Sequence, residues 1–171
     1  MPLQISWRNV SETHPIEQQS LTVFGAELML TLAGDVIVDT DWVLSGREFE
    51  SANTDLGRRI QGFLTNPEGE YLAISLQSQG SLFCNRVWNA LTEIPLGQVL
   101  SYAELARQLG SAPRAVAQAC RKNPYPGIIP CHRVVATSGI GGFMGQAHGD
   151  FVEFKRRLLA CEREIVGEVG R

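Results

Sequence analysis

The sequence predicts a protein of mixed α/β class, more specifically α+β, with a strand-rich first half and a helical second half. Two observations predict this arrangement: alternating and β-branched apolar residues run from Leu21 to Leu44, whereas apolar residues after Ser81 recur at helical spacing. The character changes at Gln79-Gly80, so we expect an N-terminal α+β domain over residues 1–79 and a mainly helical domain over residues 80–171. A chain of 171 residues, 44% of them hydrophobic, can form one domain or two small ones.

The first domain is predicted to contain an antiparallel sheet and one helix. In the stretch LTVFGAELMLTLAGDVIVDTDWVL, Gly34-Asp35 supplies a hairpin signal between two apolar runs. In the stretch ESANTDLGRRIQGFL that follows, Leu56, Ile60 and Phe63 lie at helical spacing. The motif YLAISL at 71–76 returns to strand character.

The second domain is predicted to begin and end with a helix. The first helix starts near Ser81 and stops before Pro95, and its apolar face consists of Phe83, Val87, Trp88 and Leu91. The last helix starts at a capping box of Asp150 with Glu153 and runs to about Glu162 or beyond. Its apolar residues are Phe151, Phe154, Leu158 and Leu159.

Two short helices are predicted between them. In SYAELARQLG, Ser101 and Glu104 form a capping box, and Gly110 occupies the position of a C-terminal cap. Pro113 suits the first position of the next helix, which should close at about Asn123. This is the outline of a helix-turn-helix, although a helical hairpin with a solvated basic face has the same spacing. The second helix would present Arg114, Ala115, Gln118, Arg121 and Lys122.

Charge is distributed unevenly along the chain, whose net charge is −3. Residues 1–80 carry four Lys or Arg and eleven Asp or Glu, which gives −7, while residues 81–171 carry eleven and seven, which gives +4. The second half is therefore the candidate for an anionic partner, and overall acidity argues against tight non-specific DNA binding. Neither a membrane span nor a signal peptide is indicated, so we expect a cytoplasmic protein.

The four cysteines, Cys84, Cys120, Cys131 and Cys161, are widely spaced and form no CxxC pair. This spacing argues against a disulfide scaffold and against a zinc finger, and favours reduced thiols. We therefore expect no metal ion.

The stretch GIIPCHRVVA, residues 127–136, places polar side chains within an apolar run. Free cysteine is often an inert core residue, but a buried imidazole and guanidinium beside it need partners. A thiol attacks as thiolate, so a nearby base can make it a nucleophile. Adjacent residues project in different directions, and a water between Cys131 and His132 is a more plausible relay than a direct hydrogen bond. The acceptor for His132 should come from the C-terminal helix.

The motifs IPCHRVV, RKNPYPGI, SYAELA and RAVAQA occur in an order that resembles the O6-alkylguanine-DNA alkyltransferase family, over about residues 81–162. The resemblance implies a ribonuclease H-like N-terminal domain and a single-turnover enzyme without a cofactor. It also implies a monomer that binds double-stranded DNA containing alkylated guanine through the minor groove, with possible action on O4-alkylthymine. The expected reaction is irreversible transfer of the alkyl group to Cys131.

The resemblance also implies roles for individual residues. Cys131 would be the alkyl acceptor, His132 its water-relayed base and Glu162 the residue that holds the imidazole. Asn123 would brace the turn, and Tyr102 would approach the flipped guanine. Arg114 would take the extruded nucleotide's place in the stack. The implied DNA-binding residues are Ser101, Arg114, Ala115, Gln118, Arg121 and Thr137, and the implied pocket residues are Pro126, Val134, Phe143, Met144, Gly145 and Lys155.

The chain departs from the family pattern after the cysteine. Phe143 replaces a usual tyrosine, Met144 takes the next place, and the stretch from 146 to 150 is longer than usual. Ala117 stands where glycine is more frequent. These departures keep a second interpretation open, namely a protein that binds alkylated bases without accepting the alkyl group. A cysteine hydrolase and a pure helix-turn-helix regulator are further alternatives, but the first lacks a local signature and the second leaves PCHR unexplained.

Overall fold

A computed structural model describes residues 3–44, 54–66 and 71–169. The chain divides into two compact units. Unit 1 comprises Met1–Gln79 together with the segment Pro124–Ile128, and unit 2 comprises Gly80–Asn123 and Ile129–Arg171. No described helix has both the length and the apolar composition needed to cross a membrane.

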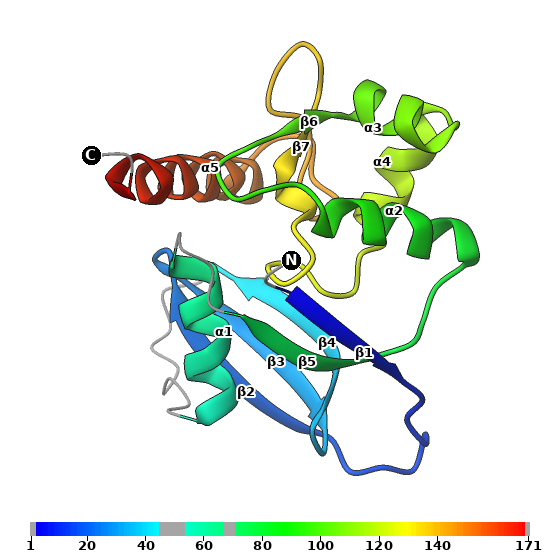
Figure 1. Cartoon of the computed structure of the whole chain (residues 1–171), viewed down its shortest axis with the longest axis vertical. Helices are drawn as coiled ribbons and strands as arrows, with labels where there is room; N and C mark the ends of the chain where they lie inside the picture. The colour runs from blue at the N-terminus through cyan, green and yellow to red at the C-terminus, as the bar shows by residue number, and fades with distance from the viewer. Residues whose placement is uncertain (1–2, 45–53, 67–70, 170–171) are drawn as a thin grey trace. The chain divides into compact units, whose positions relative to one another are not determined.

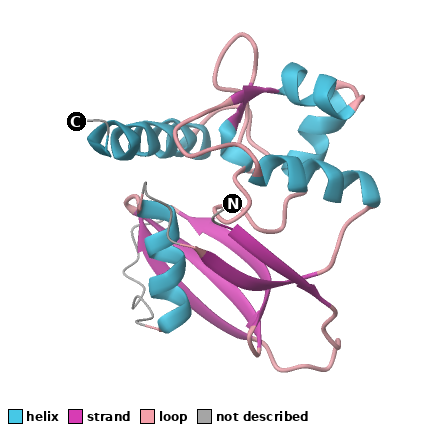
Figure 2. Cartoon of the chain, in the orientation of Figure 1, coloured by secondary structure: helices cyan, strands magenta, loops and turns pink. Residues whose placement is uncertain are grey.

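Unit 1 contains a five-stranded sheet with a helix against it, as Figures 1 and 2 show. The strands have the order β1-β5-β4-β3-β2. Strands β2, β3 and β4 form the predicted antiparallel meander, while β5 runs parallel to both β1 and β4. The α+β class is thus confirmed, and the sheet is mixed rather than antiparallel throughout. The elements are β1 (Leu3–Arg8), β2 (Glu17–Val23), β3 (Ala26–Ala33), β4 (Val36–Val43), α1 (Asp55–Thr65) and β5 (Leu72–Gln77).

The local signals in unit 1 have identifiable physical causes. The hairpin between β3 and β4 turns at Gly34, whose φ of +61° suits glycine. Helix α1 starts at Thr54, whose side chain accepts a hydrogen bond from the Gly57 backbone N–H, and it buries Ile60 and Leu64. The part of the predicted helical stretch before residue 54 lies outside the described residues. Strand β1 was not predicted, although Leu3, Ile5 and Trp7 alternate with polar residues in LQISWR and this alternation was a usable signal.

Unit 2 contains four α-helices within its described residues and a short parallel strand pair. Two predicted caps are present: Ser101 and Glu104 form a reciprocal capping box, and Gly110 ends its helix at φ +62°. The first helix starts at the predicted place, where the Ser81 side chain accepts from the Cys84 N–H. The elements are α2 (Leu82–Thr92), β6 (Leu100–Ser101), α3 (Tyr102–Leu109), α4 (Pro113–Arg121), the 3₁₀ turn η1 (Cys131–Arg133), β7 (Val134–Val135) and α5 (Asp150–Val169).

One buried side-chain hydrogen bond joins two helices of unit 2. The buried Trp88 indole N–H on α2 donates to the Ala119 carbonyl on α4 over 2.8 Å, which ties the two helices together.

Helix α5 starts one residue earlier than predicted, since the Glu153 N–H donates to the Gly149 carbonyl and Asp150 is already helical. The expected capping box of Asp150 with Glu153 is therefore wrong, because Asp150 does not occupy the cap position.

Candidate active site

A tight turn at Pro130 presents Cys131. Pro130 has φ −82° and ψ 66°, close to the inverse γ-turn, and the Cys131 N–H donates to the Ile129 carbonyl over 2.8 Å. The chain then forms the 3₁₀ turn η1, in which the Arg133 N–H donates to the Pro130 carbonyl. Proline's restricted φ suits this geometry, so the PCHR motif specifies a rigid presentation of its thiol.

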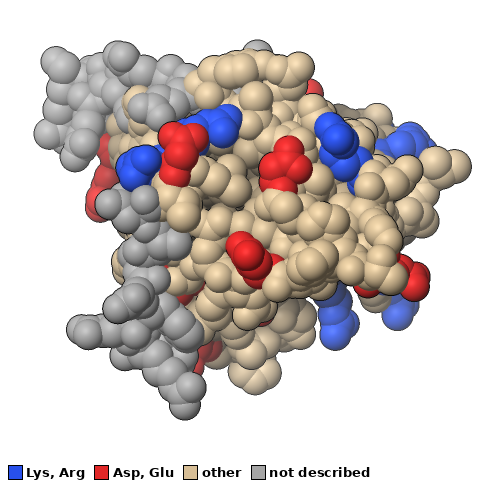
Figure 3. Space-filling model, turned by 90° about the horizontal axis from the view of Figure 1, so that it is seen from below, with Lys and Arg blue, Asp and Glu red and all other residues tan. Residues whose placement is uncertain are grey.

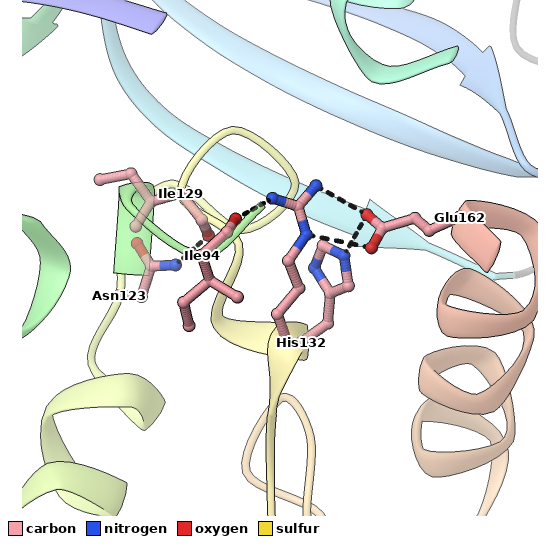
Figure 4. A network of polar contacts seen from close by, with 6 residues as sticks. Ile94, Asn123, Ile129, His132 and Glu162 are labelled. Atoms are coloured by element: carbon pink, nitrogen blue, oxygen red, sulfur yellow. Dashed lines mark hydrogen bonds and ion pairs between the residues drawn. The ribbon is translucent and has the colours of Figure 1, made fainter. Parts of the chain in front are cut away.

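The adjacent His132 faces the C-terminal helix. Its Nε2 lies 2.7 Å from Glu162 Oε1, and both side chains are almost completely buried (Figure 4). Arg133 forms a bidentate contact with the same carboxylate, with Nε 3.0 Å from Oε2 and Nη2 3.0 Å from Oε1. Its Nη1 donates to the Ile94 carbonyl. Burial alone would raise the pKa of Glu162, but His132 and Arg133 lower it to about 2. Glu162 is therefore an ionised carboxylate held by two donors.

The second nitrogen of His132 remains for proton transfer. His132 Nδ1 is buried and has no hydrogen-bond partner among the described residues. With Nε2 engaged by Glu162, Nδ1 is the nitrogen left to receive a proton. The structure thus contains the carboxylate and the imidazole of a relay of the kind that activates cysteine nucleophiles.

Cys131 lies in a polar corner of an otherwise apolar environment. It is 7% exposed, and burial raises the pKa of its thiol, whereas a hydrogen bond from Asn123 and the charge of Lys155 lower it. The Asn123 amide also donates to the Ile129 carbonyl over 2.9 Å, so one side chain supports both the turn and the thiol. A second thiol, Cys120, lies within electrostatic reach, and its pKa is raised to about 12 by burial and by Cys131.

Lys155 is fully buried and holds two backbone segments together. Its Nζ donates to the Val134 carbonyl over 2.7 Å and to the Gly142 carbonyl over 3.0 Å. Burial lowers the pKa of Lys155 to about 8, although Cys131 and Cys120 oppose this shift. The ammonium also lies 5.8 Å from the ring centre of Tyr102. Burial and the neighbouring thiols raise the pKa of Tyr102, which keeps its hydroxyl protonated as a donor.

The altered segment after the cysteine forms a tight hairpin turn. Phe143 and Gln146 exchange backbone hydrogen bonds of 2.9 Å each, and the two residues between them have positive φ, 51° at Met144 and 78° at Gly145. This is the pattern of a type I′ turn, which suits glycine but strains methionine. Phe143 is buried and packs against Phe154 at a ring separation of 6.5 Å.

Comparison with known proteins identifies the family of the chain. Residues 82–164 match the family model for the 6-O-methylguanine DNA methyltransferase DNA-binding domain. The chain is 36% identical over 115 residues to a methylated-DNA–protein-cysteine methyltransferase of Archaeoglobus fulgidus, covering 67% of this chain and 78% of the relative. It is 40% identical over 127 residues to one of Mycolicibacterium paratuberculosis, covering 72% and 71%. The chain belongs to the methylated-DNA–protein-cysteine methyltransferase family.

Solved structures support the same assignment. The Mycobacterium tuberculosis O6-methylguanine methyltransferase matches with a TM-score of 0.67 and 29% identity, over 88% of this chain and 94% of that one. The structure of Mycobacterium tuberculosis OGT in complex with DNA matches with a TM-score of 0.69 and 28% identity, over 86% and 93%. The resemblance inferred from the sequence motifs is confirmed.

Within this methyltransferase chain, the predicted DNA-binding residues lie in three places: on α4, in the turn after β7 and at the cap of α3. Arg114, Gln118 and Arg121 are exposed on α4 and, at successive helical turns, share one face. Arg121 also lies beside the hairpin turn, since its Nε is 3.4 Å from where a Cβ on Gly145 would stand. Thr137 is exposed in the turn after β7. Ala115 is half-buried on α4, and Ser101 serves first as the cap of α3.

The predicted pocket residues do not all belong to one unit. Val134, Phe143, Met144, Gly145 and Lys155 belong to unit 2, whereas Pro126 is a buried residue of unit 1. Sequence reasoning assigned no role to Arg133, which the structure shows as a bidentate partner of Glu162. Its position inside an apolar run was a usable signal, because a buried guanidinium needs a carboxylate.

Proposed function

We propose that this chain repairs double-stranded DNA by transferring the alkyl group of O6-alkylguanine irreversibly to Cys131. The observation that carries the proposal is the buried His132–Glu162 pair at 2.7 Å, adjacent in the chain to a rigidly presented thiol. The family of the chain supports the same reaction. No cofactor is required, because the thiol itself is the acceptor.

The proposed reaction begins at the thiol. Its proton passes through a water to His132 Nδ1, and Glu162 stabilises the resulting imidazolium. The sulfur then attacks the alkyl carbon, so that a carbon–sulfur bond forms while the bond from carbon to guanine O6 breaks. The departing guanine anion accepts a hydrogen bond from the Tyr102 hydroxyl, whose raised pKa keeps it protonated, and the proton taken up by His132 returns through water to the guanine. The products are a thioether at residue 131 and unmodified guanine.

Single turnover follows from the chemistry of the product. A thioester is cleaved by water, but a thioether has no electrophilic carbonyl for water to attack. Each molecule should therefore act once.

The proposed DNA contact runs through α4. Arg114 would enter the base stack of the minor groove while the damaged nucleotide is flipped out, and the small residues of α4 would allow close approach. The face drawn in Figure 3 shows basic and acidic side chains interspersed, without a broad basic surface among its described residues. We further propose that the DNA contact is local and that the protein acts as a monomer, and we place the reaction in the cytoplasm.

Mass spectrometry tests the proposal directly. Incubation with a duplex containing O6-methylguanine should add one methyl group to the peptide that contains Cys131, and Cys131→Ser should abolish the addition. Methyl transfer that persists in Cys131→Ser would overturn the assignment of the acceptor.

A second candidate is a protein that binds alkylated bases without repairing them. It is favoured by the strained Met144 at φ 51° in the altered turn and by the burial that raises the pKa of Cys131. Tight binding to the lesion with unmodified Cys131 in the same experiment would select this candidate.

A further inference from the structure

The segment Pro124–Ile128 connects two parts of unit 2 in sequence but belongs to unit 1 by its contacts. It follows α4 and ends only three residues before Cys131. Within unit 1 it is held by strand β4, by the end of β5 and by the side chain of Gln79. None of these contacts involves Cys131 or the groups that take part in the proposed reaction.

The anchoring position exists because β4 and β5 diverge. Their parallel ladder contains only two residue pairs, at Val36 and Ile37 of β4. Beyond that point the edge of β4 needs other partners. Gln79 Nε2 donates to the Val38 carbonyl over 3.0 Å, and Val38 is the first residue of β4 after the paired positions.

Thr40 provides the next two bonds along this edge. Its backbone N–H donates to the Pro124 carbonyl over 2.9 Å, and its hydroxyl donates to the Pro126 carbonyl over 2.8 Å. Thr40 is 3% exposed, so both bonds are shielded from water. One residue of β4 therefore fixes the segment at two carbonyls, two positions apart.

Tyr125, the residue between those two prolines, is also held in place by unit 1. Its ring is completely buried and lies 6.3 Å from that of Trp7 on β1. Its hydroxyl donates to the Gln77 carbonyl over 2.6 Å and receives a hydrogen bond from Gln79 Nε2 over 2.8 Å. The phenol is thus satisfied as both donor and acceptor, which locks its orientation.

Gly127 shows how closely the segment approaches the sheet. Its φ is +88°, and an added Cβ would stand 3.1 Å from the Trp42 ring and 3.2 Å from Leu28. The segment cannot shift without disturbing the core of unit 1.

From this anchor the chain leads directly to the thiol. Ile128 and Ile129 are both buried, and the Ile129 carbonyl accepts from the Asn123 amide and from the Cys131 N–H. The rigid turn at Pro130 then restricts the position of the Cys131 backbone. A displacement at Ile128 would pass along this short path to the sulfur.

We propose that Thr40 and Tyr125 are positioning residues for the acceptor thiol, which they hold in register with Asn123 through the segment Pro124–Ile128. The proposal rests on the alkyl transfer proposed above. It gives unit 1 a direct part in reactivity, beyond general support of the fold.

The test uses the full chain and compares Thr40→Val with Thr40→Ser. Valine keeps the shape but removes the hydroxyl bond to Pro126, whereas serine keeps that bond. Ile60→Val, in the buried face of α1, is the matched control for a loss of stability without a change at the anchor. Tyr125→Phe repeats the comparison at the second residue, should Thr40→Val fail to fold.

Two readouts are followed on the peptide that contains Cys131: methyl transfer from an O6-methylguanine duplex, and alkylation by iodoacetamide as a function of pH. Thr40→Val should slow transfer about three- to tenfold, the range expected for one hydrogen bond. It should also move the midpoint of the iodoacetamide profile upward, because the thiolate loses register with the Asn123 amide. Thr40→Ser and Ile60→Val should keep the wild-type rate and midpoint.

Three outcomes would overturn the inference: an unchanged rate and midpoint in Thr40→Val, equal slowing of Thr40→Val and Ile60→Val with no change of midpoint, or the same loss in Thr40→Ser. The iodoacetamide profile needs no DNA and thus tests the positioning role separately. Failure of the wild-type protein to accept a methyl group would instead overturn the proposed function.

Discussion

His132 Nε2 and Glu162 Oε1 lie 2.7 Å apart, although 30 residues separate them in the chain. Both side chains are buried, and Arg133 completes the coordination of the carboxylate. The pair leaves one imidazole nitrogen directed elsewhere, and the carboxylate holds the ring in that orientation. Predictions for rate and for stability follow from this geometry.

Glu162→Gln should slow alkylation of Cys131 at least about tenfold while sparing DNA affinity, because the amide cannot stabilise an imidazolium as a carboxylate does. The variant should also lose roughly 3 kcal/mol of unfolding free energy, since the guanidinium of Arg133 loses its counter-charge and His132 loses a charged hydrogen-bond acceptor. Single-turnover kinetics and denaturant unfolding measure the two effects. Glu153→Gln, which removes an exposed ion pair with Arg156, is the control and should change neither quantity appreciably.

The low pKa of Glu162 predicts a specific acid sensitivity. Its pKa is lowered from 4.5 to about 2 in the folded protein, so its contribution to stability is fully present above pH 4.5. That contribution is lost as the pH falls from about 4.5 through 2, where the folded carboxylate takes up its proton. Unfolding free energies measured across this range should fall less steeply in Glu162→Gln than in the wild type. Parallel curves for the two proteins would contradict the assigned pKa.

Asp39 should have the opposite effect. Partial desolvation of its carboxyl, reinforced by Asp41, raises its pKa from 3.8 to about 6. Its favourable contribution is therefore present below pH 3.8 and lost as the pH rises through 6. Asp39→Asn should raise the melting temperature at pH 7 by a small amount, because the group lies at the surface and solvent screens its charge. Glu12→Gln, at another exposed acidic position, should leave it unchanged.

Arg114→Ala should separate base flipping from the chemistry. Only duplex DNA requires an extruded nucleotide to be replaced in the stack, so repair of an O6-methylguanine duplex should fall at least about tenfold. Reaction with free O6-benzylguanine should remain close to wild type. The comparison is made by rates of Cys131 modification, with Arg107→Ala on α3 as a control for loss of an exposed positive charge. Equal losses with both substrates would remove Arg114 from the flipping step.

Much of unit 2 could be predicted because its signals are local. Ser81, the capping box of Ser101 with Glu104, and Gly110 each act on backbone groups within one helical turn. The meander of unit 1 was predictable for the same reason, since its alternation and turn glycine are short-range features. The exception is Asp150, where a capping pattern occurs one residue inside the helix.

The sequence by itself determined the nature of the acceptor: a cysteine after proline, followed by histidine and arginine, among motifs specific to one family. Only the tertiary structure showed the contact between His132 and Glu162 that the resemblance implied, and it alone decided that Arg133 shares the carboxylate and that Thr40 and Tyr125 hold the segment before the thiol. The physical reason is that these contacts join residues 29 to 86 positions apart. Such contacts are set by strand order and helix packing, and neither leaves a periodic pattern in the chain.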